Sequence, residues 1–125
     1  MINTYGILIG VFANSKKELL HYDVKGFQKF FFDNKEKYSL LEKIGFNNNP
    51  EWIREIYEAT SFLKMAEVIK LCPGLEDKCS VSEICKEAYR ISVKPLLEKK
   101  EIFELESLSE EFSRKFEFKA IKTLK

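Results

Sequence analysis

The stretch from Asn49 to Gly74 constrains the fold more than any other part of the sequence, because it carries signals for both ends of a long helix. Asn49 is a good N-cap, and Pro50 suits the first helical position, where its missing N–H costs nothing. Pro73 cannot continue a helical hydrogen-bond ladder, and Gly74 accepts a left-handed conformation. We therefore expect one long central helix over residues 50–72.

The apolar residues of this predicted helix lie on two faces. At about 100° per residue, the face of the first half points away from the face of the second half. The first-half residues are Trp52, Ile56, Ala59 and Leu63, and the second-half residues are Phe62, Met65, Ile69 and Cys72. This pattern predicts a helix between two layers, an N-terminal sheet on one side and a helix over residues 81–88 on the other. A core helix buried on all sides is the alternative.

The two ends of the chain carry strand signals. Residues 2–13 form a continuous apolar run rich in β-branched and aromatic side chains, which is typical of a central strand buried on both faces. Residues 19–24 and 27–32 predict two further strands and complete an antiparallel meander. Residues 115–122 alternate apolar and charged side chains, so we expect a C-terminal strand in the same sheet.

The middle of the chain is predicted to be helical. Asp33 and Glu36 have the spacing of a capping box and Gly45 suits a helix end, so a short helix fits residues 34–44. A second capping box, from Ser80 to Glu83, opens a helix that Pro95 ends near residue 91. Residues 75–78 are expected to form a loop, whereas residues 102–108 suit either a helix or a strand. The whole sequence therefore predicts a single α+β domain, residues 1–125, with an antiparallel sheet of three to five strands packed with a helical middle.

Composition excludes several classes of protein. The chain has 125 residues, of which 45% are apolar, so it can form one domain whose core needs no disulfide. The balance of 21 Lys+Arg against 20 Asp+Glu gives no net field toward nucleic acid or an anionic membrane. Residues 5–13 are too short for a transmembrane helix, and no basic residue precedes them as in a signal peptide. We therefore expect a cytoplasmic protein that does not contact membranes.

The residues that usually carry catalysis or bind metals are few. His21 is the one histidine, and the spacing of Cys72, Cys79 and Cys85 matches no zinc pattern. We expect these cysteines to be reduced, as in cytosolic proteins. No phosphate-binding, dinucleotide-binding, zinc-protease or serine-hydrolase motif occurs. We therefore predict no catalytic residue, no metal and no cofactor.

Charge is segregated near the C-terminus. The acidic side chains predicted to contact a partner are Glu101, Glu104, Glu106, Glu110 and Glu111, and the basic side chains that follow are Arg114, Lys115, Lys119 and Lys122. An acidic patch of this kind can dock one protein partner with a basic surface. We predict a non-catalytic protein-binding module, a small inhibitor that blocks its partner as immunity proteins, antitoxins and anti-defence proteins do. A nucleic-acid-binding regulator that uses the basic residues is the alternative, and a small enzyme is the third hypothesis.

Overall fold

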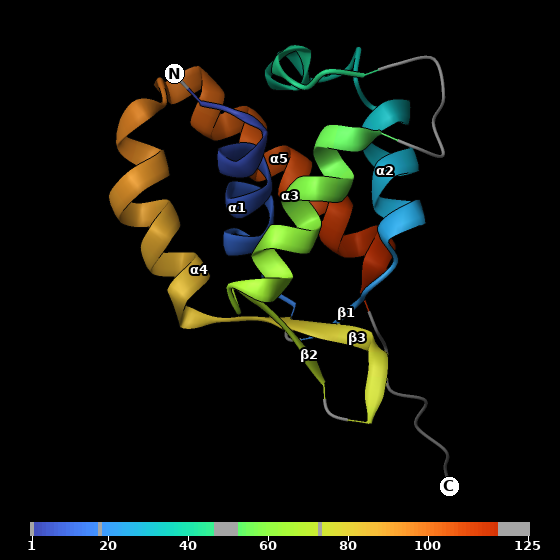
Figure 1. Ribbon diagram of the computed structural model, residues 1–125. Coiled ribbons are helices and arrows are strands. Elements are labelled where there is room, and N and C mark those ends of the chain that lie inside the picture. Colours follow the sequence, from blue (N-terminus) through green and yellow to red (C-terminus); the bar gives the residue numbers. More distant parts are fainter. Residues whose placement is uncertain (1, 18, 47–52, 73, 118–125) are drawn as a thin grey trace, which may run out of the picture.

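The computed structural model describes residues 2–17, 19–46, 53–72 and 74–117. These residues form an α+β fold in which helices stand on one end of a small antiparallel sheet (Figure 1). The strands lie in the order β1-β3-β2. The elements are α1 (Thr4–Ala13), β1 (Leu20–His21), α2 (Val24–Asp33), the 3₁₀-helix η1 (Ser39–Lys43), α3 (Arg54–Met65), β2 (Ile69–Cys72), β3 (Leu75–Val81), α4 (Glu83–Ala88), the π-helix η2 (Tyr89–Val93), the 3₁₀-helix η3 (Lys94–Leu96) and α5 (Lys99–Phe116).

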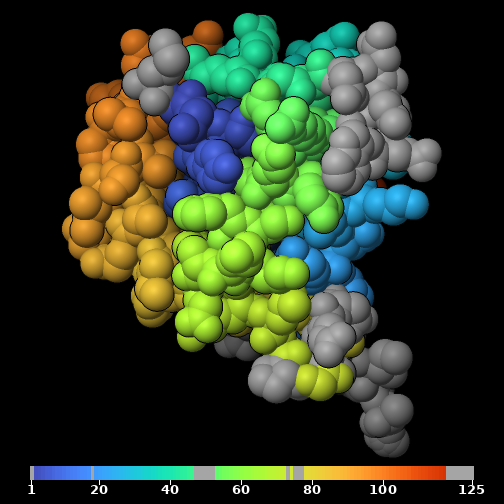
Figure 2. Space-filling model, in the orientation of Figure 1, coloured from blue at the N-terminus to red at the C-terminus, as the bar shows by residue number. Residues whose placement is uncertain are grey.

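The centre of the fold is α1, and the predicted strand over residues 2–13 is wrong. An apolar run of this length fits a buried helix as well as a buried strand. Asn3 caps the helix, because its side chain accepts a hydrogen bond from the Gly6 N–H at 3.0 Å. The helix packs against α3, α4, η2 and α5, and only a small part of its surface is visible between α3 and α4 (Figure 2).

The predicted strand over residues 27–32 is also wrong, because these residues belong to α2. Asp23 caps the helix by accepting a hydrogen bond from the Gly26 N–H at 2.9 Å. Phe27, Phe30 and Phe31 then fall on one side of the helix and are all buried. The strand predicted over residues 19–24 is confirmed only at the two residues of β1.

The prediction of a long central helix over residues 50–72 is wrong in its second half. Within the described residues α3 ends at Met65, the chain reverses through Glu67 at φ 61°, and β2 begins at Ile69. Pairing with β3 decides the outcome, since Ile69 lies opposite Val81 and the residues between Ile69 and Val81 form a hairpin. Gly74, at φ 77°, therefore belongs to the turn of a hairpin and not to the end of a helix. The expected loop over residues 75–78 is part of β3, and residues 49–52 lie outside the described residues.

The prediction of two buried faces is confirmed for one face only. Ile56, Ala59 and Leu63 are buried, as the first-half pattern predicts. Phe62 and Met65 are 55% and 80% exposed, so the second-half pattern does not describe a packing face. The helix α3 is therefore not a spine between two layers.

The last third of the described chain is helical. The helix after the hairpin begins at Ser82, two residues later than predicted, where the Ser82 hydroxyl accepts from the Cys85 N–H at 3.3 Å. Residues 102–108, which the sequence left open, lie inside α5. The predicted C-terminal strand is wrong at Lys115 and Phe116, which belong to α5. Glu117 does lie against the sheet, through an isolated antiparallel bridge to Leu20 of β1, whereas residues 118–122 lie outside the described residues. The sheet thus combines β1, from the predicted N-terminal meander, with the β2–β3 hairpin from the middle of the chain, which the sequence assigned to a helix and a loop.

The short helix predicted over residues 34–44 is confirmed only as the 3₁₀-helix η1. Its predicted start is wrong, because Asp33 is the last residue of α2 and does not cap a new helix. Among the described residues, no helix has the length and apolar character needed to cross a membrane.

Candidate functional site

The helix α5 organises the charged surface of the protein. Its buried stripe faces α1 and α2 through Leu105, Leu108, Phe112 and Phe116. At its N-terminus the Glu98 N–H donates to the Glu101 carboxylate at 2.9 Å, and Glu98 in turn completes a capping box. The Glu101 side chain therefore caps the N-terminus of the helix. The other acidic residues of α5 lie on the two flanks of the buried stripe.

One flank holds the segment that leads into η1. Glu104 accepts from the Ser39 hydroxyl at 2.8 Å and from the Leu40 N–H at 3.1 Å. Glu111 accepts from the Lys37 ammonium at 2.8 Å and from the Tyr38 hydroxyl. Both carboxylates thus act inside the molecule, where they fix the turn after α2 against α5.

The contacts of Glu111 shift two pKa values in opposite directions. The hydrogen bond from Lys37, followed by that from Tyr38, lowers the pKa of Glu111. Burial and the neighbouring Glu111 carboxylate raise the pKa of the Tyr38 hydroxyl. The Glu111 side chain is 30% exposed, so solvent screens part of this effect.

Glu111→Gln is expected to lower stability by up to about 1 kcal/mol at neutral pH. A carboxylate with a lowered folded pKa stabilises the protein above its unfolded pKa, and this contribution is lost as the pH falls through the folded pKa. The difference from wild type should therefore shrink below about pH 4. Urea unfolding at several pH values measures this difference, with Glu87→Gln, at an exposed ion pair, as the control. A difference that does not change with pH would contradict the assignment.

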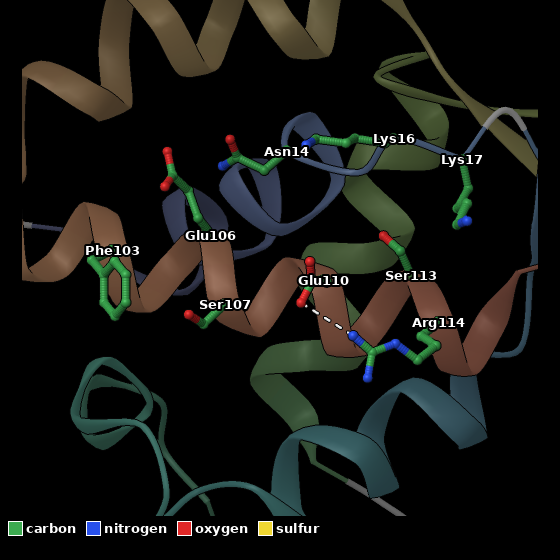
Figure 3. Close-up of a pocket in the computed structure, with 9 residues that line it drawn as sticks. All are labelled: Asn14, Lys16, Lys17, Phe103, Glu106, Ser107, Glu110, Ser113 and Arg114. Carbon is green, nitrogen blue, oxygen red and sulfur yellow. Dashed lines mark hydrogen bonds and ion pairs between the residues drawn. The ribbon is translucent and has the colours of Figure 1, made fainter.

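The other flank of α5 lines a groove of about 600 Å³ (Figure 3). Its opposite wall is the connection between α1 and β1. Phe103 and Glu106 lie toward one end, and Lys17 and Arg114 lie toward the other. The lining residues are Asn14, Lys16, Lys17, Phe103, Glu106, Ser107, Glu110, Ser113 and Arg114.

The wall opposite α5 is fixed by hydrogen bonds to α1 and α5. The Ser113 hydroxyl donates to the Ser15 hydroxyl at 2.8 Å, and the Lys17 N–H donates to the same oxygen at 3.2 Å. The Asn14 amide donates to the Gly10 carbonyl at 2.8 Å. The backbone that presents the lysines of this wall is therefore positioned before any ligand binds.

The structure brings together only two of the five predicted acidic residues. Glu106 and Glu110 share the groove, whereas Glu104 and Glu111 lie on the other flank and Glu101 belongs to the helix end. The groove adds residues that the sequence did not single out. Phe103 could have been found, because in a helical register it falls outside the buried stripe. Lys16 and Lys17 carry no such sequence signal.

The basic residues of the nucleic-acid hypothesis are only partly described. Arg114 lines the groove and pairs with Glu110 at 3.1 Å, and Lys115 is exposed near the end of α5. Lys119 and Lys122 lie outside the described residues. The hypothesis therefore stays a prediction.

The cysteines are free thiols, and two of them are buried. Burial raises the pKa of Cys79 and of Cys85 to about 12, so both are protonated at neutral pH and are poor nucleophiles. Within the described part of the chain, no three or more His, Cys, Asp or Glu side chains are placed to hold a metal ion. Comparison of the whole chain with protein-family models, with curated proteins and with solved structures finds no match.

Proposed function

We propose that the protein is a non-catalytic protein-binding module whose contact surface is the groove side of α5. The observation that carries this proposal is Phe103, an aromatic side chain that is 71% exposed at a groove also lined by Glu106 and Glu110. Aromatic side chains are enriched in protein interfaces because they bury a large area at low entropic cost. Carboxylates beside them steer a partner of complementary charge.

The rigidity of α5 supports this role. The capping box fixes its N-terminus, and the completely buried Leu105, Leu108 and Phe112 hold its inner face. A partner that contacts Phe103 therefore meets a side chain on an ordered helix, which reduces the entropy lost on binding.

The groove is better suited to binding than to catalysis. Its charged side chains are lysines, glutamates and one arginine, and Arg114 and Glu110 already pair with each other. Neither His21 nor a cysteine lines the groove. Within the described chain, the groove lining therefore contains no imidazole or thiol, and its serines Ser107 and Ser113 have no histidine beside them in the lining to act as a base.

The specific role that we propose is inhibition. A small protein that covers a functional surface of one partner needs a contact surface but no reacting group, as in immunity proteins, antitoxins and anti-defence proteins. This assignment to a class rests on chain size and on the charge segregation in α5.

Phe103→Ser is expected to weaken binding of the partner by about tenfold or more, because an aromatic anchor at an interface commonly contributes about 2 kcal/mol. The full chain would serve as bait in a lysate of its source cells, and the recovered partner would be purified. Titration calorimetry would then measure Kd for wild type, for Phe103→Ser and for the double variant Glu106→Lys/Glu110→Lys.

Matched control variants show whether a change in Kd comes from the groove or from any exposed substitution. Ile84→Ser removes a similarly exposed apolar side chain from α4, and Glu42→Lys/Glu58→Lys reverses two exposed charges away from the groove. These controls should leave Kd unchanged. A partner that binds the groove variants and the wild type equally well would contradict the proposed surface, and a partner whose activity is unaffected on binding would contradict inhibition.

A further inference from the structure

We propose that Lys16, Lys17 and Lys86 form a carboxylate-binding subsite for an acidic segment of the protein partner. This inference rests on the proposed function and specifies the chemistry of the partner. The lysines extend the binding surface from the groove beside α5 to α4, which carries Lys86. The partner segment would thus present carboxylates to the lysines and apolar or basic side chains to Phe103 and Glu106.

A second hollow lies next to the groove and shares two lysines with it. This hollow has a volume of about 250 Å³ and is lined by Ser15, Lys16, Lys17, Val81 and Lys86. Among the described residues, its lining includes three ammonium groups and no carboxylate. Lys16 and Lys17 therefore stand between two hollows, where a chain segment that occupies both would pass beside their ammonium groups.

The three ammonium groups are weakly neutralised within the described residues. Lys16 has no ion pair there, and Lys17 lies 3.4 Å from Glu117. Lys86 lies 3.8 Å from Glu83, whose side chain is 87% exposed. Exposed ion pairs of this kind contribute little free energy, so a partner carboxylate can displace them at small cost.

The groove favours a protein segment over a nucleic acid as the occupant. A nucleic acid carries a phosphate at every nucleotide, and a strand along both hollows would bring phosphates against Glu106 and Glu110. A polypeptide can change the sign of its charge along its length. The bipolar lining, with Lys17 and Arg114 toward one end and Phe103 and Glu106 toward the other, matches such a segment (Figure 3).

The experiment titrates the ¹⁵N-labelled full chain with three probes and follows amide chemical shifts. The first probe is a short capped peptide with glutamates in one half and leucine and lysine in the other. The second is the same peptide with glutamine in place of glutamate, and the third is an oligothymidylate of equal length. The glutamate peptide should shift the amides of residues 14–17 and 86, and the glutamine peptide should not.

Lys16→Glu/Lys17→Glu is expected to weaken binding of the glutamate peptide by about tenfold, and added salt should weaken wild-type binding in the same direction. Lys43→Glu/Lys94→Glu is the matched control, because it makes the same charge change on η1 and η3. The subsite would be overturned if both double variants bound the glutamate peptide equally well. It would also be overturned if the oligothymidylate bound more tightly than the glutamate peptide, or if the amides of residues 14–17 and 86 did not shift. The Phe103 variant and the purified partner test the proposed function separately, so either proposal can fail alone.

Discussion

Phe112→Ala is expected to lower the free energy of unfolding by about 3 to 5 kcal/mol, the usual cost of removing a fully buried aromatic ring. The Phe112 side chain has no exposed surface. It joins α5 to the two other helices that form the aromatic core, because its ring contacts Phe12 of α1 and three phenylalanines of α2. Deleting the ring would therefore open a cavity at the point where three helices meet.

The ring contacts of Phe112 explain why removing this ring should lower the free energy of unfolding more than removing a ring at the edge of the core. Ring centroids lie 5.3 Å from Phe12, 5.1 Å from Phe27 and 4.8 Å from Phe116. The Phe30 and Phe31 rings lie at 5.4 and 5.8 Å. Apart from Phe116, these neighbours are rigid rings on α1 and α2, so they cannot collapse into the cavity without moving those helices.

Urea unfolding measures the loss, and Phe103→Ala on the same helix is the control. It makes the same chemical change at a side chain that is 71% exposed, so its effect should stay within about 0.5 kcal/mol. Phe112→Leu keeps most of the volume and should cost less than the alanine variant, and it provides a measurable protein if Phe112→Ala does not fold. Equal costs for Phe112→Ala and Phe103→Ala would contradict the assigned core.

The aromatic core also shows why the N-terminal strands were predicted wrongly. The run over residues 2–13 is apolar on every side because helices pack around α1. A helix without a polar face does not show the 3.6-residue alternation of apolar and polar side chains that identifies an amphipathic helix. In α2, Phe27, Phe30 and Phe31 do have helical spacing, but aromatic residues also favour strands. The caps at Asn3 and Asp23 were the local signals that could have identified both helices.

At Ile69 the sequence predicts a helix where the structure has a strand, and this error has a different cause. The segment from α3 to β2 carries helix-compatible apolar spacing throughout, and only pairing with β3 makes the second half a strand. Strand pairing is a contact between segments, so propensity within one segment does not reveal it. The sequence did identify Gly74 as a place where the chain changes direction, and the structure shows which element it interrupts.

The candidate site was predictable in composition but not in geometry. Acidic residues of α5 were evident from the sequence, yet the capping role of Glu101 and the internal bonds of Glu104 and Glu111 depend on partners in three dimensions. A helical projection separates Glu106 and Glu110 from Glu104 and Glu111 once α5 is known to be a helix. Lys16 and Lys17 join the groove only because α1 packs against α5.

That close packing of α1 on α5 leads to the second large effect, which is expected for Gly10→Val. A Cβ atom at Gly10 would lie 2.3 Å from Leu105 Cδ2 and 3.0 Å from Leu105 Cγ. Leu105 is completely buried, so its side chain cannot turn aside into solvent. Overpacking of this kind costs about 1 to 3 kcal/mol, and the added valine methyl groups place this variant toward the upper end of that range.

A double-mutant cycle with Leu105→Ala separates the clash from other effects of the substitution. Leu105→Ala alone should cost about 2 to 5 kcal/mol by leaving a cavity, but in the presence of Gly10→Val the new side chain fills part of that cavity. The double variant should therefore be more stable than the sum of the single effects predicts, by about 0.5 to 3 kcal/mol. Strict additivity in urea unfolding would mean that Gly10 and Leu105 do not meet. The close contact of α1 with α5, which also positions the lysine wall of the groove, would then be wrong.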